Sequence, residues 1–389
     1  MSTAAGLMGL AWSAPWWLAL AVAAWRWRDS PSLEEFPDTA PSPAPLLSVI
    51  VPARDEAAHI EACVRAILAS RYPLLELIVV DDHSSDGTAA CARAGAAGDV
   101  RLTVIHAPPL APGWLGKQWA CHHAAAVARG AFLLFTDADV RHAPDLHARL
   151  VHATLASGAA LVSVVGFQET RTFWERVVQP FVFAILAQWY GGPGAVNRAT
   201  DSRRKIANGQ CLCFPRAAYD RFGGHATVRG KSAEDLAFAQ RMTAAGMRVL
   251  LTLGRRQMST RMYGSLREIV AGWAKNVYSA GRETLPGGVG GRWLARILVP
   301  APALAALVPV VALVGGALGW LSAAWLLFGV LATLALTLWF LAMGREFELA
   351  PWYALTFPLG ALVYLYIAVV AVRRGDRVRW KGRAYDLQE

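Results

Sequence analysis

The chain has 389 residues, of which 55% are hydrophobic and only 17% are charged, and its formal net charge is +10. This composition excludes an ordinary soluble protein, and it predicts membrane segments beside one folded domain of about 200–250 residues. Basic residues stand next to apolar runs, as at Arg26 and Arg28. This placement predicts that the basic residues lie at the cytoplasmic surface of a membrane, and it argues against nucleic acid as a partner.

An apolar segment without charge opens the chain over residues 5–25, and Arg26 and Arg28 follow it. About 20 apolar residues span a bilayer, so residues 1–28 are expected to form a transmembrane anchor. Charges after the apolar run, and not before it, argue against a cleaved signal peptide. They favour an outer N-terminus and a cytoplasmic domain beyond residues 29–46, a linker with five prolines.

From residue 47 the pattern changes to strand-like apolar runs that alternate with helical stretches. This alternation predicts an α/β domain over residues 47–262, with a mostly parallel sheet covered by helices and ligands beyond the carboxyl ends of its strands. The expected helices are residues 56–70, 86–97, 117–129 and 145–157, the last with Pro144 at its start. The expected strands are Leu47–Ala53, Leu75–Asp81, Arg101–Ile105, Phe132–Thr136, Ala159–Val165 and Met247–Leu253.

The C-terminal part of the chain returns to apolar composition. We expect an interfacial helix region at 263–292, transmembrane helices within 293–372 and a basic tail at 373–389. Residues 173–190 are aromatic-rich and fit either an interfacial helix or a buried core helix. Three full spans after a cytoplasmic domain would leave the basic tail outside, against the positive-inside trend. Either one apolar run is peripheral or re-entrant, or that trend fails here.

The cysteines predict no metal or disulfide framework. Their number is odd, and the spacing of Cys211 and Cys213 is poor for zinc. We therefore expect structural cysteines in a reducing compartment.

Carboxylates follow the strand-like runs, and two pairs stand out. Asp81 and Asp82 can accept hydrogen bonds from a nucleobase and ribose, or they can form part of a helix-capping turn. Asp137 and Asp139 follow the strongly apolar run 132–136. Two such carboxylates form a hard-oxygen site that suits Mg²⁺ or Mn²⁺ and can bridge through the metal to phosphates.

Three other places add polar groups. A carboxylate of Glu234 or Asp235, at the start of a predicted helix, can act as a general base on an acceptor hydroxyl, or it can complement the helix dipole. In the turn after the first strand, Arg54 or Glu56 can make a polar contact with a nucleotide. Lys117 can pair with a diphosphate or remain a solvated surface residue.

The order of these motifs carries a resemblance. Val-Pro-Ala-Arg-Asp-Glu, Val-Val-Asp-Asp-His-Ser-Ser-Asp-Gly-Thr, Thr-Asp-Ala-Asp and Ala-Glu-Asp-Leu follow one another along residues 47–280. This arrangement resembles the family-two inverting glycosyltransferases, which have the GT-A fold. The segment Gly-Trp-Leu-Gly-Lys-Gln-Trp-Ala is most similar to the lipid-modifying branch of carotenoid and hopanoid-associated enzymes, related to ceramide glucosyltransferases.

The resemblance implies a nucleotide-diphospho-sugar donor, expected to be a UDP-sugar, and a divalent metal, Mg²⁺ or Mn²⁺. Asp82, with Asp81, would contact the nucleoside, whereas Asp137 and Asp139 would handle the diphosphate and the metal. Asp235 would be the base, with Glu234 beside it. The other expected donor-binding residues are Pro52, Arg54, Glu56, Lys117, Gln210 and Trp273.

One departure from the family pattern matters. Members that build polysaccharides carry Gln-x-x-Arg-Trp, and the corresponding residues 269–273 match it only at Trp273. This difference speaks against processive synthesis and leaves Arg267 and Lys275 as alternative partners of the leaving diphosphate.

The sequence thus predicts an inverting glycosyltransferase of the cytoplasmic membrane, with its catalytic domain in the cytoplasm and a lipid hydroxyl as acceptor. The alternatives are a polyprenyl-phosphate glycosyltransferase that supplies cell-envelope glycan synthesis, a membrane nucleotidyltransferase and a non-enzymatic nucleotide-binding scaffold.

Overall fold

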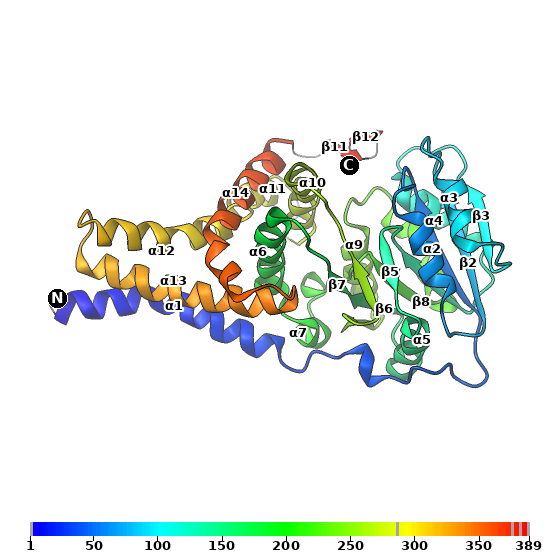
Figure 1. Cartoon of the computed structure of the whole chain (residues 1–389), viewed down its shortest axis with the longest axis horizontal. Coiled ribbons are helices and arrows are strands. Elements are labelled where there is room, and N and C mark those ends of the chain that lie inside the picture. The colour runs from blue at the N-terminus through cyan, green and yellow to red at the C-terminus, as the bar shows by residue number, and fades with distance from the viewer. Residues whose placement is uncertain (1–2, 285–287, 375–376, 381–382, 387–389) are drawn as a thin grey trace. The chain divides into compact units, whose positions relative to one another are not determined.

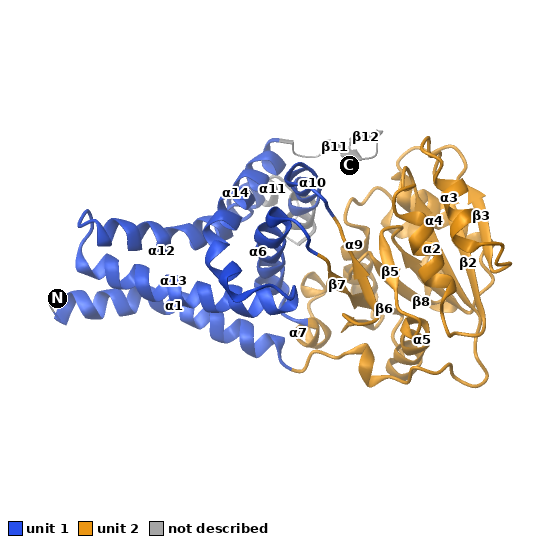
Figure 2. Cartoon of the chain, in the orientation of Figure 1, with its two compact units in different colours: residues 1–28, 170–192, 263–375 blue, residues 29–169, 193–262, 376–389 orange. Residues whose placement is uncertain are grey.

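The computed structural model describes residues 3–284, 288–374, 377–380 and 383–386, with side chains described outside 278–292 and 374–386. The chain forms two compact units, which Figure 2 colours separately. The helical unit contains residues 1–28, 170–192 and 263–375, and the α/β unit contains residues 29–169, 193–262 and 376–389.

The α/β unit is built on a seven-stranded sheet with the order β3-β2-β1-β4-β8-β6-β9 (Figure 1). Its neighbouring strands pair in parallel except at β8, which is antiparallel to both β4 and β6. The prediction of a mostly parallel sheet is therefore confirmed. The strands are β1 (Leu47–Ala53), β2 (Leu75–Asp81), β3 (Leu102–His106), β4 (Phe132–Thr136), β6 (Leu161–Val165), β8 (Cys211–Pro215) and β9 (Val249–Leu253).

The sequence patterns did not predict β8 or a small second sheet. In that sheet β10 (Met258–Thr260) lies between β5 (Val140–His142) and β7 (Phe167–Gln168). These three strands have only two or three residues each, too few to show a period. Strand β8 reads Cys-Leu-Cys-Phe-Pro, and its proline and two cysteines do not indicate a strand, although its first four residues are buried.

Helices cover both faces of the large sheet. The predicted helix over 145–157 begins at Leu146 and not at Pro144, because Asp145 occupies the N-cap position. The helices of this unit are α2 (Ile60–Leu68), α3 (Thr88–Ala96), α4 (Gly116–Val127), α5 (Leu146–Ser157), α7 (Pro193–Arg198), α8 (Arg216–Phe222) and α9 (Glu234–Ala244), with short 3₁₀ turns at Leu33–Glu35, Ser202–Arg204 and Gly224–Val228.

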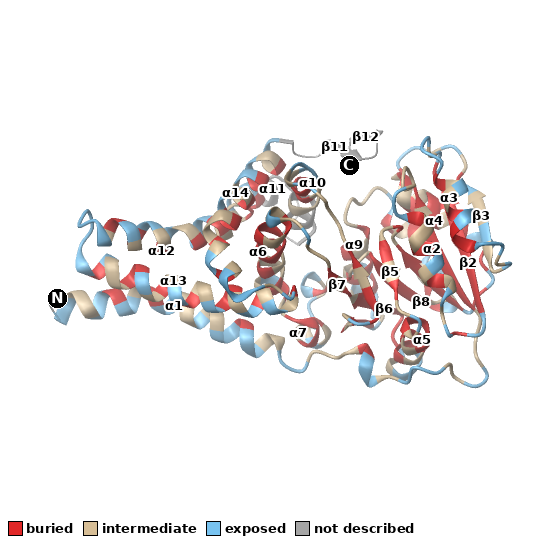
Figure 3. Cartoon of the chain, in the orientation of Figure 1, coloured by how far each residue is buried: buried red, intermediate tan, exposed pale blue. Residues whose placement is uncertain are grey.

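Two hydrophobic cores hold the α/β unit together, one on each face of the sheet (Figure 3). Successive residues of β1 alternate between them, since Val49 and Val51 enter one core and Ile50 enters the other. Cys63 and Cys213 lie fully buried in the first core, as expected of structural cysteines. This rigid sheet fixes the positions at which its strands end.

Among the described residues of the helical unit, four segments are long and apolar enough to cross a membrane, namely residues 3–27, 293–317, 323–346 and 351–373. Pro180 lies inside α6 without ending it. The helices are α1 (Thr3–Trp27), α6 (Phe173–Tyr190), α10 (Leu266–Thr284), α11 (Gly288–Leu298), α12 (Ala301–Ala317), α13 (Ala323–Glu346) and α14 (Phe357–Arg374), with a 3₁₀ turn at Pro351–Thr356; the tail adds the hairpin of β11 (Arg377–Trp380) and β12 (Arg383–Asp386).

Candidate active site

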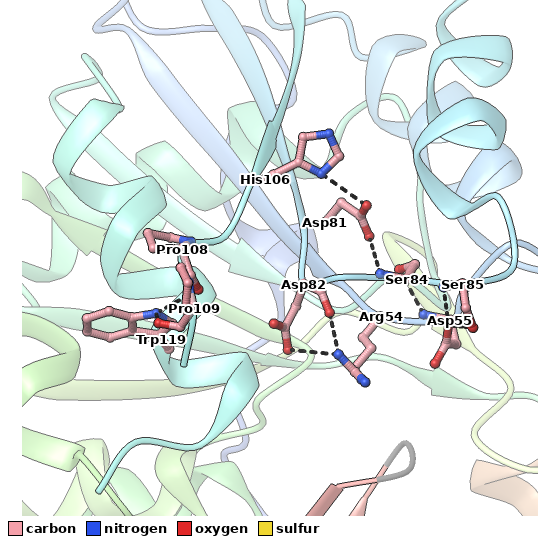
Figure 4. A network of polar contacts seen from close by, with 10 residues as sticks. All are labelled: Arg54, Asp55, Asp81, Asp82, Ser84, Ser85, His106, Pro108, Pro109 and Trp119. Atoms are coloured by element: carbon pink, nitrogen blue, oxygen red, sulfur yellow. Dashed lines mark hydrogen bonds and ion pairs between the residues drawn. The ribbon is translucent and has the colours of Figure 1, made fainter. Parts of the chain in front are cut away.

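The first group of site residues lies where β1 and β2 end side by side (Figure 4). Arg54 donates a hydrogen bond of 2.6 Å from Nη1 to the backbone oxygen of Asp82, whose carboxylate is 4.0 Å away. The Asp81 carboxylate accepts a hydrogen bond from the Ser84 backbone N–H (3.1 Å) and lies 3.2 Å from His106 Nδ1. Arg54, Asp81 and Asp82, predicted from separate motifs, therefore meet in one place.

The turns after these strands interlock and fix the local backbone. Asp55 and His83 both have positive φ angles, 50° and 56°, which bend the chain sharply after each strand. The Glu56 backbone N–H donates to the Thr88 hydroxyl at 2.8 Å, which ties the first turn to the start of α3. Pro52 lies within β1, opposite Val80 of β2. The Arg54–Asp82 pair is thus held by backbone contacts from both turns.

Lys117 joins two of the acidic motifs. Its Nζ lies 2.7 Å from Asp137 Oδ1 and 3.0 Å from Glu234 Oε1. Burial alone would lower the pKa of Lys117, but the two carboxylates raise it well above its ordinary value. The lysine is therefore a fixed cation between the strand end and the start of α9, and not a solvated surface residue.

Asp139 is a carboxylate with a raised pKa in this network. Burial, together with the nearby charges of Asp137 and Glu56, raises the pKa of Asp139 to about 7. Its Oδ1 is buried and accepts no hydrogen bond from any described residue. A buried carboxylate of this kind is stabilised when a cation binds it.

The metal prediction rests on these two aspartates. Among the described residues no group of three or more His, Cys, Asp and Glu side chains converges as a metal site. Mg²⁺ and Mn²⁺ need no such group when substrate phosphates and water complete the coordination. Asp137 and Asp139, with the unsatisfied oxygen of Asp139, therefore fit a divalent cation that is shared with a diphosphate.

Asp235 is held in a defined orientation at the start of α9. Its Oδ2 accepts a hydrogen bond from the Gly209 backbone N–H (2.9 Å), and its Oδ1 accepts one from the Leu236 backbone N–H (2.8 Å). Burial raises the pKa of Asp235, against the lowering effect of the Leu236 hydrogen bond and the Lys117 charge. A raised pKa makes this carboxylate a stronger base than an exposed aspartate.

Strand β8 brings Gln210 into the site because it runs antiparallel to its neighbours. Its first residue, Cys211, pairs with Thr136 at the carboxyl end of β4. The Thr136 hydroxyl donates to the Gln210 backbone oxygen at 2.8 Å, while the Gln210 side-chain oxygen accepts from Gln168 and Asn208, each at 3.2 Å. The predicted binding residue Gln210 thus lies beside the strand end that precedes Asp137.

The sequence patterns missed Gln118, a buried residue next to Lys117. Its side chain accepts a hydrogen bond from the Gly230 backbone N–H (3.0 Å) and donates one to the Lys231 backbone oxygen. It therefore clamps the loop that leads into Glu234. The one sequence signal for a role of Gln118 is that this polar residue directly follows Lys117 in a mostly apolar helix.

Among the described residues, no ion pair or hydrogen bond joins Trp273 to the site residues of the α/β unit. It belongs to the helical unit, on α10, where its indole N–H donates to Gln179 Oε1 at 2.8 Å and its ring packs edge-on against Phe183. Its donor-binding role stays a prediction, as does the choice between Arg267 and Lys275 of the same helix.

Comparison with known proteins agrees with this geometry. Residues 48–222 match the model of the family described as "Glycosyl transferase family 2". Two curated relatives, the 4,4'-diaponeurosporenoate glycosyltransferases of Staphylococcus aureus strains MRSA252 and USA300, are each 26% identical over 245 residues, which is 62% of this chain. The match covers 63% of their length, a little under two thirds.

A solved structure shares the fold. The mannosyltransferase PcManGT of Pyrobaculum calidifontis, in complex with GDP-Man and Mn²⁺, superposes with a TM-score of 0.52 at 23% identity, covering 85% of this chain and 97% of that one. The sheet and this superposition define a GT-A domain, with carboxylates at the ends of its strands. Residues 48–222 thus form a domain that matches the family-two glycosyltransferases, and the curated relatives that the chain resembles are diaponeurosporenoate glycosyltransferases.

Proposed function

We propose that this chain is a membrane-bound inverting glycosyltransferase that transfers a sugar from a nucleotide-diphospho-sugar to the hydroxyl of a lipid acceptor of carotenoid, hopanoid or glycolipid type. The observation that carries the proposal is the cluster around Lys117, in which one partly buried cation bridges Asp137 and Glu234 beside the base candidate Asp235. The named relatives act on a carotenoid acid, which supports a lipid acceptor.

Different residues of the site would bind different parts of the donor. Arg54, Asp81 and Asp82 would hold the nucleoside at the ends of β1 and β2. Lys117 would pair with the donor diphosphate, and its position between two carboxylates keeps it protonated. A divalent ion at Asp137 and Asp139, when bound, would neutralise charge on the leaving diphosphate.

Asp235 would accept the proton of the acceptor hydroxyl as that oxygen attacks the anomeric carbon. The bond to the diphosphate oxygen breaks on the opposite face of the sugar, so the anomeric configuration inverts. The hydrogen bonds from Gly209 and Leu236 orient the carboxylate for this task without neutralising it.

The first test is Asp235→Asn, assayed with the purified full-length chain, a panel of nucleotide-sugars including UDP-sugars, and extracted membrane lipids. We expect loss of transfer, by about 100-fold or more, with nucleotide binding retained. Glu234→Gln is the matched neighbour, and it should weaken donor binding through the loss of its contact with Lys117. Normal turnover of Asp235→Asn would remove Asp235 from the base role.

The same assay separates the alternatives. A polyprenyl-phosphate acceptor is already ionised and needs no base, so substantial Asp235→Asn activity on that acceptor would favour this second function. Release of pyrophosphate in place of nucleoside diphosphate would indicate a nucleotidyltransferase. Unchanged turnover in Asp137→Asn and Asp139→Asn would favour the last alternative, a non-enzymatic nucleotide-binding scaffold. Mass spectrometry of the lipid product identifies both sugar and acceptor.

The location is part of the proposal. The apolar helices of the helical unit support anchoring in a membrane. Arg26, in the last turn of α1, and Arg28, just after it, support a cytoplasmic position of the catalytic domain. Membrane fractionation and protease protection of the α/β unit in sealed inverted vesicles test these two points.

A further inference from the structure

The helical unit contains a bundle of three long helices, α1, α12 and α13 (Figure 1). Gly9 of α1 faces Ala324 at the start of α13, and Trp12 and Trp16 follow against Trp325 and Phe328. Helices α1 and α13 therefore run in the same direction. Helix α12 runs opposite to them, since Gly316 faces Leu326 and Gly329 faces Leu313 across the hairpin.

One end of this bundle carries charge and the other does not. No charged residue occurs between Arg296 and Arg345, which include the hairpin around Trp320, or before Arg26 in α1. Arg26 binds the final carbonyls of α6, with 2.7 Å to the Tyr190 oxygen. The positive-inside trend makes this charged end the cytoplasmic one.

Two contacts of α14 lie toward that charged end. Phe357 stacks on Phe340 of α13 at 5.4 Å between ring centroids, and the Tyr364 hydroxyl donates to the Val299 oxygen just before α12 at 3.1 Å. Phe340 is about 26 Å along α13 from Ala323, at 1.5 Å per residue. Val299 is about 27 Å from the far end of α12 on the same scale.

These two depths are equal, although Phe357 and Tyr364 are about 10 Å apart along α14. A helix that crossed the membrane beside α13 would place Tyr364 that much deeper in the bilayer. Helix α14 therefore runs across the bundle axis and not along it, as its steep inclination to α12 and α13 in Figure 1 also shows. It packs against α6, where Gly360 leaves room for the Val177 backbone oxygen.

Helix α14 also lies beside α10. Helix α10 contains five charged residues in 19, a composition that belongs at a membrane surface and not in hydrocarbon. The face of α14 that no described helix covers is apolar: Leu362, Tyr366 and Val369, at helical spacing, are 53%, 60% and 39% exposed. Such a face matches the boundary between headgroups and acyl chains, where tyrosine is favoured.

We propose that α14 does not span the membrane but lies in the plane of the cytoplasmic leaflet, with its Leu362–Tyr366–Val369 face in the lipid. The chain then crosses the bilayer three times, through α1, α12 and α13. This topology places the six basic residues of the tail from Arg373 to Arg383 on the same side as Arg26 and Arg345. It removes the conflict with the positive-inside trend. The inference rests on the membrane anchoring in the proposed function and on no catalytic step.

Cysteine labelling in cells tests the number of crossings. Trp320→Cys marks the hairpin between α12 and α13, and Glu389→Cys marks the segment that follows the basic tail. With a membrane-impermeant maleimide we expect labelling of Trp320→Cys in intact cells, and of Glu389→Cys only after permeabilisation. Labelling of both positions from the same side would show that α14 spans and would overturn the inference, whatever the enzyme's activity.

Two lysine substitutions test the environment of α14. Tyr366→Lys and Leu334→Lys change exposed apolar residues near the middle of α14 and of α13, respectively. We expect Leu334→Lys to lower the membrane-inserted fraction by roughly tenfold or more, and Tyr366→Lys to lower it less than twofold, because lysine at an interface reaches water. Equal losses would overturn the in-plane position, and recovery of the unsubstituted chain in the soluble fraction would overturn both this inference and the anchoring.

Discussion

Protonation of Asp139 should control metal binding between pH 6 and pH 8. Its pKa is raised from an ordinary 3.8 to about 7 by burial and by the charges of Asp137 and Glu56. A metal binds the ionised carboxylate, so it must displace a proton whenever the pH lies below that pKa. Metal affinity is therefore close to its full value at pH 8 and is lost as the pH falls through 7.

With a pKa of about 7, the ionised fraction of Asp139 falls from about nine-tenths at pH 8 to about one-tenth at pH 6. The apparent affinity for Mn²⁺ should therefore fall about tenfold over this interval in the absence of donor. Isothermal titration of the purified full-length chain with MnCl₂, repeated in buffers of different ionisation enthalpy, measures both the affinity and the proton released.

Substitutions separate the causes of this shift. Asp137→Asn removes a neighbouring negative charge, so it should weaken binding and also move the pH dependence to lower pH. Asp139→Asn should abolish both the proton release and the pH dependence. An affinity for Mn²⁺ that is constant from pH 6 to pH 8 in the unsubstituted chain would refute the reasoning.

Two further substitutions test positioning and stability. A Cβ at Gly209 would lie 3.1 Å from Asp235 Oδ2, so Gly209→Ala should lower kcat by about 10- to 100-fold with little change in donor affinity. The control is Gly344→Ala, which should leave kcat unchanged because the nearest atom is 3.9 Å from the added Cβ. An unchanged kcat of Gly209→Ala would argue against the Gly209 contact. Glu76 is buried and accepts hydrogen bonds from neighbouring side chains and backbone, so Glu76→Gln should lower the free energy of unfolding by about 1–3 kcal/mol in denaturant titration. The control is Glu61→Gln, at a more exposed side chain, which should lower it by less than about 0.5 kcal/mol. Equal losses would contradict this account.

Much of the site was predictable from sequence because its acidic residues are local to strand ends. The runs that became β2 and β4 have the predicted bounds, and a parallel sheet brings the carboxyl ends of such strands to one edge. Asp81, Asp82 and Asp137 could therefore be assigned to that edge from hydropathy and order alone. The family resemblance then gave each of them a role.

Other features depended on contacts that no local pattern encodes. Lys117 lies between Asp137 and Glu234, and Glu234 is more than one hundred residues away in the chain. Only the pairing of β8 against β4 brings Gly209 to the base candidate Asp235, because an antiparallel strand begins at the edge where its parallel neighbours end. The sequence contains these residues, but the pairing of strands decides that they meet.

For the helical unit, too, composition determined some features and tertiary contacts determined others. Composition by itself determined that the chain has apolar helices long enough to cross a bilayer, because hydropathy is a sum over neighbouring residues. It could not decide whether α14 crosses, since an apolar helix can lie along a membrane or across it. The stacking of Phe357 on Phe340 and the Tyr364–Val299 hydrogen bond carry the proposal that it does not cross, because they place two points of α14 at one level of the helix bundle.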